Sequence, residues 1–361
     1  MRIAVLAHLH HPIAEPFRGG TEMHTALVAD ELTRRGHEVT LFAKAGSHTA
    51  ARLVPLVGED FEFGQMPGQA GDRSEEILVD AVGTAIASIR EDGYDAVLNN
   101  SLGPQPYTSL AGQPMVTILH TPPTLEKVLA AITEPGWEPD PRHAYVSVSE
   151  FNSAAWRGVL PEVTCVPNGI QLDRWVDSGA AEADLAVWAA RITPEKGLHL
   201  AIDAIRRISL RLEFSGPIAD QAYFDAEIAP RLGAGVSHLG HLGHGALARQ
   251  LARGAVFVSS SVWAEPFGLT LVEAMSCGTP VAAFANGAAG EIVTPDAGRL
   301  AAEETAAALA VAIEAARRID RRSVRARAED FDARIMVDRY EELLQDVARR
   351  PAPLPAGTAM A

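Results

Sequence analysis

At 361 residues the chain is longer than one typical domain, so two domains are expected, and its hydrophobic content of 47% fits a well-packed globular protein. The net charge of −15 argues against a nucleic acid bound through its phosphates. No apolar stretch reaches the ~18 residues of a membrane span, and the apolar N-terminal run lacks the length and flanks of a signal peptide. We therefore expect a cytoplasmic protein without a transmembrane segment, for which peripheral contact with a membrane remains open.

In the first half of the chain, short apolar runs alternate with helical patterns. Strands are predicted at 2–7, 37–43, 52–57, 94–98, 115–119, 144–149 and 163–166, and helices at 21–36, 74–91 and 151–156. The segment 58–73 is expected to be irregular. Such alternation predicts a parallel sheet covered on both faces, with ligands beyond the carboxyl ends of the strands.

Two features of this half lie at predicted strand ends. Gly19 and Gly20 precede a helix, whose first free N–H groups form an anion site, although a pair of glycines is also an ordinary turn. His120 follows the strand at 115–119, where a histidine is more often a structural hydrogen-bonding group than a catalytic one. Cys165 and Cys277 are far apart in apolar surroundings, which predicts buried thiols and no disulfide or metal site.

A Pro-Asn-Gly turn at 167–169 places the domain boundary near residue 170. The predicted domains are therefore 1–170 and 171–330, followed by a helix at 331–348 and a Pro- and Ala-rich tail at 349–361 that is expected to be disordered. Within the second domain, 177–184 is expected to form a loop. Strands are predicted at 185–190, 210–214, 236–240, 255–261, 279–284 and 296–300, with helices at 198–208, 245–253, 304–318 and 321–329.

Arg191 and Lys196 lie between the end of a predicted strand and the start of a helix, near the carboxyl edge of the second sheet. Together they could neutralise a diphosphate, the arginine through bidentate hydrogen bonds and the lysine as a point charge. The alternative is a pair of solvated loop cations.

The segment 263–284 is predicted to form a loop, a short helix and a strand, with Glu265 and Glu273 eight positions apart. Gly268 lets the backbone approach a ligand, and a helix that begins near Leu269 offers free N–H groups to an anion. Glu273, one turn inside that helix, could accept hydrogen bonds from sugar hydroxyls, and Glu265 could reach a second polyol. Phosphate flanked by hydroxyls describes a nucleotide sugar; the alternative is two solvated glutamates.

This segment closely resembles the signature of the retaining GT-B glycosyltransferases of family 4 (glycosyl transferases group 1). The matching residues are Glu265, Pro266, Phe267, Gly268, Glu273, Ala274, Gly278, Pro280 and Val281. The resemblance implies that Glu273 binds the nucleotide ribose and that Glu265 contacts hydroxyls of the donor hexose. It also implies that the amides around Phe267, Gly268 and Leu269 touch the donor.

Other segments extend the resemblance over nearly the whole chain. RITPEKG resembles the family motif whose Arg191 and Lys196 hold the donor phosphates, with alanine at 190 where glycine is usual. ILHTPP resembles the segment that places a histidine, here His120, beside the donor sugar. The loop with Gly19 and Gly20 resembles the one that faces the donor phosphates and the acceptor. Two departures are Pro217 in place of a second glycine, and Asn286, which is expected to tolerate a left-handed turn.

The resemblance implies an α/β GT-B fold: two Rossmann-like α/β/α domains facing across a cleft, an N-terminal acceptor side, a C-terminal donor side and a last helix that crosses back. It implies retaining transfer from a nucleotide-diphosphate sugar, most commonly a UDP-sugar, to an acceptor hydroxyl. The catalytic residues would be His120, Arg191, Lys196 and Glu265. No metal or other cofactor is expected, because cations and amides neutralise the leaving phosphate.

Two other functions remain open: a GT-B sugar epimerase or phosphorylase, and a non-catalytic nucleotide-sugar-binding protein. The D-x-D string at 330–332 is predicted to cap a helix and not to bind metal. The acceptor, the donor base and hexose and the oligomeric state are left open, since the loops 8–20, 58–73 and 99–106 carry no decipherable code. His8, His10 and His11 are expected on the acceptor side or in solvent.

Overall fold

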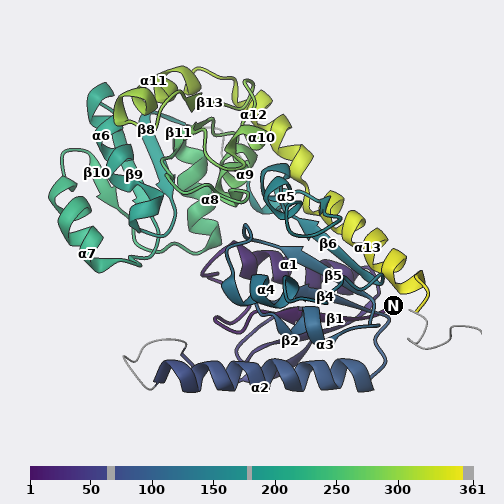
Figure 1. Cartoon of the computed structure of the whole chain (residues 1–361). Helices are drawn as coiled ribbons and strands as arrows, with labels where there is room; N and C mark the ends of the chain where they lie inside the picture. Colours follow the sequence, from purple (N-terminus) through teal and green to yellow (C-terminus); the bar gives the residue numbers. More distant parts are fainter. Residues whose placement is uncertain (63–69, 177–180, 353–361) are drawn as a thin grey trace, which may run out of the picture. The chain divides into compact units, whose positions relative to one another are not determined.

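The structure is a computed structural model that describes residues 1–62, 70–176 and 181–352. The chain divides into two compact units (Figure 1). Unit 1 comprises Met1–Val148, Asn152–Val166 and the chain from Met336, and unit 2 comprises Ser149–Phe151 and Pro167–Ile335. The tail segment 353–361 and residues 63–69 and 177–180, for which a tail and loops are predicted, lie outside the described residues.

Unit 1 contains a parallel sheet of seven strands among its described residues, in the order β3-β2-β1-β4-β5-β6-β7. The strands are β1 (Arg2–Ala7), β2 (Glu38–Lys44), β3 (Arg52–Val57), β4 (Ala96–Asn100), β5 (Met115–Leu119), β6 (His143–Ser147) and β7 (Thr164–Cys165). The order reverses between β1 and β4, and a crevice for ligands is expected at this switch point beyond the carboxyl ends of the two strands.

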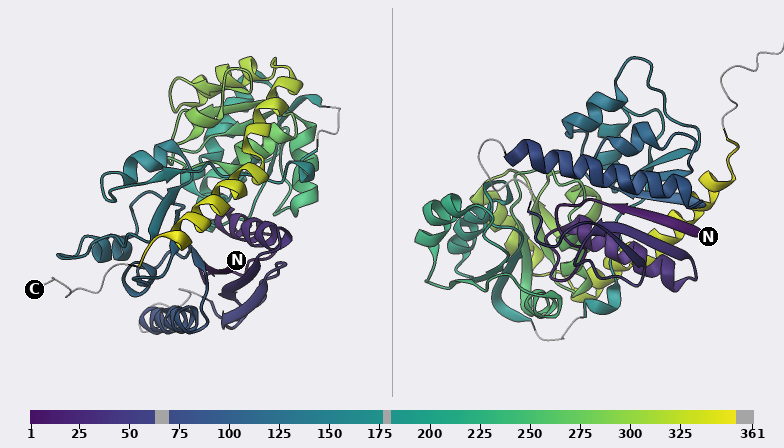
Figure 2. Two further views of the ribbon diagram at one scale, coloured as in Figure 1. Left: turned by 90° about the vertical axis from the view of Figure 1, so that its right-hand side faces the viewer. Right: turned by 90° about the horizontal axis from the view of Figure 1, so that it is seen from below.

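Helices cover both faces of this sheet, and Figure 1 shows α2 on one side and α1 with α13 on the other. The helices are α1 (Gly20–Arg34), α2 (Ala70–Glu91), α3 (Gln105–Ser109), α4 (Glu126–Ile132), α5 (Glu150–Trp156) and α13 (Ala333–Arg349). Figure 2 shows α13 beside α1, to which it is joined by ion pairs from Arg35 to Asp338 and Glu341.

Three sequence predictions for unit 1 are corrected. Helix α2 begins at Ala70 and not at 74. The predicted loop 99–106 contains the end of β4 and the start of α3. The helices α3 and α4 are absent from the prediction, because short segments without a regular apolar period give little signal.

Unit 2 contains a parallel sheet of six strands among its described residues, in the order β10-β9-β8-β11-β12-β13. The strands are β8 (Glu182–Ala189), β9 (Arg211–Ser215), β10 (Val236–His238), β11 (Gly254–Ser259), β12 (Val281–Phe284) and β13 (Gly298–Ala301). The order again reverses between the first and fourth strands, β8 and β11, so each unit is Rossmann-like.

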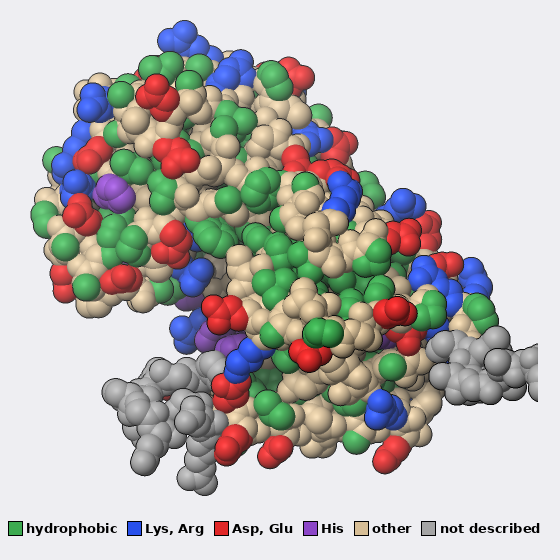
Figure 3. Space-filling view, in the orientation of Figure 1, with side chains coloured by type: hydrophobic (Ala, Val, Ile, Leu, Met, Phe, Trp, Pro, Cys, Tyr) green, Lys and Arg blue, Asp and Glu red, His purple; other side chains and the backbone are tan. Residues whose placement is uncertain are grey.

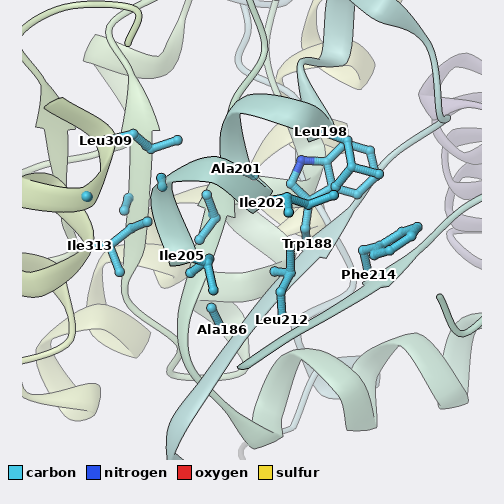
Figure 4. Close-up of a cluster of buried hydrophobic side chains, with 14 of the residues drawn as sticks. Ala186, Trp188, Leu198, Ala201, Ile202, Ile205, Leu212, Phe214, Leu309 and Ile313 are labelled. Atoms are coloured by element: carbon cyan, nitrogen blue, oxygen red, sulfur yellow. The ribbon is translucent and has the colours of Figure 1, made fainter. Parts of the chain in front are cut away.

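The core of unit 2 lies between the sheet and two helices, α6 (Leu198–Ile208) and α11 (Ala306–Ala316). Figure 4 shows Leu198, Ile202 and Ile205 of α6 directed at Trp188 and Leu212 of the sheet. The regular apolar period of α6 explains why its predicted bounds, 198–208, match the structure. The other α-helices are α7 (Gln221–Tyr223), α8 (His244–Arg253), α9 (Leu269–Ser276), α10 (Ala289–Ile292) and α12 (Arg321–Ala328).

Strand β8 starts at Glu182, so the predicted loop 177–184 is wrong for its last three residues. The reason is pairing that lies far away in sequence: the carboxylates of Glu182 and Asp184 each lie 2.7 Å from Arg211, and Glu182 also lies 2.7 Å from Arg253. These arginines neutralise an acidic segment that by composition alone is typical of a loop.

The remaining expectations concern small features. Cys277 is a buried free thiol, whereas Cys165 is free but only partly buried. Asp332 accepts a hydrogen bond from the amide of Arg334 at 2.9 Å, so it caps α13 as predicted.

No helix in the described parts of the chain has an apolar run long enough to cross a membrane. Acidic and basic side chains are intermixed on the face drawn in Figure 3.

Candidate functional site

The switch point of unit 2 is built from the loops that follow β8 and β11. A short turn, Pro194–Lys196, ends at Gly197, which has a left-handed φ of 63°. A Cβ on Gly197 would lie 2.2 Å from the Ser260 carbonyl oxygen, so only glycine allows the two loops to approach this closely. Ser260 Oγ donates to the Lys196 carbonyl oxygen at 3.0 Å, and the Val262 amide donates to Glu195 at 2.9 Å.

This approach brings together two residues that the sequence places 69 positions apart. Lys196 Nζ donates to Glu265 Oε1, and Ser261 Oγ donates to the same oxygen at 3.1 Å. The Lys196 and Glu265 side chains are only 15% and 25% exposed, so water screens their attraction incompletely. By contrast, Arg191 is exposed and has no hydrogen-bond or ion-pair partner among the described residues.

A third loop, after β12, holds the backbone of Glu265. The amide of Ala288 donates to the Glu265 carbonyl oxygen at 2.9 Å, and Gly287 has a φ of 56°. A Cβ on Gly287 would lie 2.2 Å from that oxygen. The left-handed residue of the turn is Gly287, so the turn forms without a left-handed Asn286, whose side chain donates to the Ser261 carbonyl oxygen at 3.2 Å.

Helix α9 begins beside this loop. Its N-cap is Gly268, which has a φ of 105°, and no side chain caps the helix, so the amides of Leu269 and Thr270 in its first turn are open to an anion, whereas the Leu271 amide donates to the Gly268 carbonyl oxygen. Phe267 is 4% exposed, with its ring centroid 5.7 Å from that of Phe331. The Phe267 side chain therefore belongs to the core, and only its backbone can face a ligand.

Glu273, in the second turn of α9, is 5% exposed, which excludes the alternative of a solvated helix residue. Burial raises the pKa of Glu273 to about 8. No described residue donates a hydrogen bond to its carboxyl group. A buried carboxyl group without protein donors is costly unless a ligand supplies them, so this group is suited to bind hydroxyls.

In unit 1, His120 follows β5 and meets the end of β4. His120 Nε2 lies 2.8 Å from Asn100 Oδ1, and the ring of His24 stands edge-on to the His120 ring with centroids 4.8 Å apart. Burial holds the pKa of His120 well below its usual range, with added repulsion from His24 and His8. His120 is therefore a neutral imidazole with one donor and one acceptor nitrogen.

Gly19 is the N-cap of α1 and Gly20 its first residue, as expected for an anion site. However, Glu22 in the first turn is 5% exposed, and a Cβ on Gly19 would lie 3.1 Å from its Oε2 atom. The positive end of α1 is thus already beside a carboxylate of the chain itself, which weakens the site for a phosphate. His8 lies 3.5 Å from Glu22 and is 6% exposed, so of the two alternatives for His8, acceptor side or solvent, exposure to solvent is excluded.

Sequence reasoning missed four residues of these sites: Ser261, which bonds Glu265, and Glu22, His24 and Asn100 around the unit 1 switch point. Asn100 and Glu22 could have been found from their positions, because both lie at a strand end or a helix start near predicted ligand loops. His24 had no signal, since it lies in mid-helix. Among the described residues, no group of three or more His, Cys, Asp or Glu side chains is arranged to hold a metal ion.

Comparison with known families covers most of the chain. The model of "Glycosyltransferase Family 4" matches residues 18–174, and that of "Glycosyl transferases group 1" matches residues 174–329. The two matches meet at residue 174, close to the start of the main part of unit 2 at Pro167.

Two curated relatives are similar over different spans. The D-inositol 3-phosphate glycosyltransferase of Mycobacterium avium is 27% identical over 331 residues, which cover 79% of this chain and 78% of the relative. The glycogen synthase of Mycobacterium tuberculosis is 31% identical over 193 residues, which cover 48% of this chain and 46% of the relative.

Solved structures share the fold. Sucrose-phosphate synthase from Thermosynechococcus elongatus superposes with a TM-score of 0.75 at 20% identity, over 96% of this chain and 98% of that one. Anabaena HepE in complex with UDP-glucose superposes with a TM-score of 0.73 at 20% identity, over 96% and 100%. At such identities the likeness establishes the GT-B fold and nothing finer.

Proposed function

We propose that this chain transfers a hexose from a UDP-sugar to an acceptor hydroxyl. The proposal proceeds from the family: the chain belongs to the family 4 and group 1 glycosyltransferases and is an enzyme of that class. The transfer retains the anomeric configuration and needs no metal ion. Unit 2 binds the donor, and unit 1 provides the acceptor side together with His120, which contacts the transferred sugar.

The observation that carries this proposal is the arrangement around Glu265. Lys196 contacts its carboxylate, the uncapped start of α9 follows four residues later, and Glu273 lies buried one turn further on. Phosphates at the amides of α9 would have Lys196 and Arg191 as counter-charges. Ribose hydroxyls would supply the hydrogen-bond donors that the Glu273 carboxyl group lacks.

In the reaction, the bond between the anomeric carbon and the UDP oxygen breaks, and the acceptor oxygen forms the new bond on the same face. The acceptor proton passes to the leaving phosphate, so the products are UDP and the glycoside. This reaction needs no covalent nucleophile, so Glu265, whose Oε1 atom accepts from Lys196 and Ser261, is assigned to the donor hydroxyls. Lys196, Arg191 and the helix amides stabilise the charge that builds up on the phosphate, which is the role a metal ion would otherwise serve.

Uridine diphosphate is proposed as the leaving group because it is the commonest choice in the family that the motifs resemble. The structural likeness to a protein bound to UDP-glucose agrees with this choice. The D-inositol 3-phosphate enzyme indicates that polyol acceptors are worth testing first.

The test is a nucleotide-release assay on the purified chain with UDP-glucose and other nucleotide sugars, with a panel of sugars and polyols and in the presence or absence of EDTA. We expect UDP release that depends on the acceptor, persists in EDTA and gives an α-linked product by NMR from an α-linked donor. Isomerised donor without acceptor would indicate an epimerase, and phosphate-dependent cleavage of a glycoside would indicate a phosphorylase. Donor binding without turnover for any acceptor would indicate a binding protein, and loss of activity in EDTA would contradict metal independence.

A further inference from the structure

A group of polar side chains fills the switch point of unit 1. Asn100 ends β4 and is fully buried, His120 follows β5, and His24 comes from α1 with 2% of its surface exposed. His24 Nε2 is 3.1 Å from the Tyr340 hydroxyl on α13. Of this group, the proposed mechanism uses only His120, so the buried carboxamide of Asn100 needs a separate explanation.

We propose that Asn100 is a positioning residue that fixes His120 as the tautomer protonated on Nε2, so that Nδ1 presents a lone pair to a hydroxyl of the transferred sugar. This proposal rests on the proposed function for the identity of the ligand. The assignment of the tautomer stands on the geometry of unit 1 alone.

The first step is the hydrogen bond at His120 Nε2. In the amide orientation of the structure, Asn100 Oδ1 lies 2.8 Å from Nε2, and Asn100 Nδ2 is buried without a partner among the described residues. A carboxamide oxygen can only accept, so this orientation places the proton on His120 Nε2. A neutral imidazole carries one proton, so Nδ1 is then the acceptor. No described residue forms a hydrogen bond with Nδ1, which leaves this nitrogen for a ligand.

The second step is the orientation of the ring. The edge-on contact with His24 limits rotation of the His120 ring, and the bond from His24 to Tyr340 holds His24 in place. The groups that face His120 are therefore His24 from α1, His8 from the loop after β1, and Asn100 from β4. The carboxylate of Glu22 is paired with His8. When the plane of the ring and its tautomer are both fixed, Nδ1 can accept a hydrogen bond only from a hydroxyl that approaches along its lone pair.

The tautomer can be measured without a substrate. In a long-range proton–nitrogen NMR spectrum of protein labelled on histidine nitrogens, the His120 signals are assigned by their loss in His120→Asn. We expect Nε2 to carry the proton in the wild-type chain and both tautomers to be populated in Asn100→Ala. A proton on Nδ1 in the wild-type chain would mean that the amide of Asn100 is turned round, and would overturn the proposal even if sugar transfer were confirmed.

The kinetic test uses Asn99 as a matched control. Asn99 is also fully buried at the end of β4, but it bonds Thr117 and Ser101 and not His120. We expect Asn100→Ala to lower kcat about tenfold with little change in the KM for the donor, because one orienting hydrogen bond is lost. Asn99→Ala should leave kcat unchanged even though it loses as much thermal stability as Asn100→Ala, or more. Equal losses of kcat in both variants would show that Asn100 acts only through folding.

Two further variants separate positioning from stability. In the His120→Ala background, Asn100→Ala should cause no further loss of kcat, because the residue acts through His120. In Asn100→Asp, the new carboxylate raises the pKa of His120, so a protonated ring that no longer accepts at Nδ1 forms as the pH falls. The activity of Asn100→Asp should therefore drop at acidic pH where the wild type stays flat. Additive losses, or a pH profile for Asn100→Asp identical to that of the wild type, would refute the proposal. If no nucleotide sugar is turned over at all, the proposed function fails, while the NMR result still decides the tautomer.

Discussion

The first six strands of each Rossmann-like unit follow the same order, but the polar side chains at the two switch points differ in charge. In unit 2 the loops after β8 and β11 carry a cation and a carboxylate in contact, Lys196 and Glu265, next to an uncapped helix start. In unit 1 the ends of β4 and β5 carry a neutral carboxamide and a neutral imidazole, Asn100 and His120. The shared topology therefore decides where a site lies, and the side chains in the loops decide what it binds.

A helix start beside each switch point shows the same contrast: α1 follows β1 in unit 1, and α9 follows β11 in unit 2. Helix α1 has a buried carboxylate, Glu22, at its N-terminus, whereas α9 has none in its first turn. A phosphate is therefore favoured at α9 and disfavoured at α1. This difference agrees with a donor site in unit 2 and with a site for uncharged hydroxyls in unit 1.

The largest expected effect is on the charged site of unit 2. Replacing Lys196 by Ala removes a cation from the leaving phosphate and should lower kcat by about 10³-fold, in the range found when one transition-state donor is removed. The control is Arg207→Ala, an exposed cation in the last turn of α6, which should leave kcat unchanged. Steady-state UDP release measures both. Unchanged turnover in Lys196→Ala would break the assignment of the phosphate site to unit 2.

The second prediction concerns the loop that supports Glu265. Gly287→Ala places a Cβ 2.2 Å from the Glu265 carbonyl oxygen and should cost about 3 kcal/mol of stability together with a loss of donor binding. Gly290→Ala is the control, because its Cβ would meet nothing within 4 Å, and it should be neutral or slightly stabilising. Thermal unfolding and UDP-glucose binding by calorimetry report the two effects. Equal behaviour of the two alanine variants would show that the support of Glu265 is dispensable.

The third prediction concerns Glu273, whose pKa is raised by burial from 4.5 to about 8. The native state then holds a proton that the unfolded chain releases, so this residue favours folding at low pH and loses that advantage as the pH rises through about 8. Relative to Glu273→Gln, the wild type should lose up to about 1.4 kcal/mol of stability per pH unit between pH 5 and 8. Thermal unfolding of both proteins across this pH range tests the prediction. If the stability of the two proteins changed with pH in the same way, the Glu273 carboxyl group would not be buried without a partner.

The smallest expected effect is at Arg191, which is exposed and unpaired within the described residues. Arg191→Ala should lower kcat by less than tenfold, far less than Lys196→Ala does, because water screens an exposed charge. The effect should shrink further at high salt. An unchanged kcat in Arg191→Ala would contradict a role for Arg191 on the leaving phosphate and would leave Lys196 as the cation that stabilises it.

Much of the fold could be predicted from local patterns. The bounds of α6 and of the strands β1, β3 and β5 match, because apolar runs and a regular helical period are properties of short segments. The start of β8 could not be predicted, since its acidic residues are neutralised by Arg211 and Arg253, which follow later in the chain. Short helices such as α4 were missed for lack of a period.

For the candidate site, the sequence by itself determined the residue types: two cations after one strand, two glutamates around a glycine-started helix, and a histidine at a strand end. Only the tertiary structure decided that Lys196 contacts Glu265, that Glu273 is buried, and that His120 meets Asn100 and His24. These contacts join residues from different loops, so they depend on the order of strands in each sheet. That order is set by packing over the whole unit, which no local pattern records.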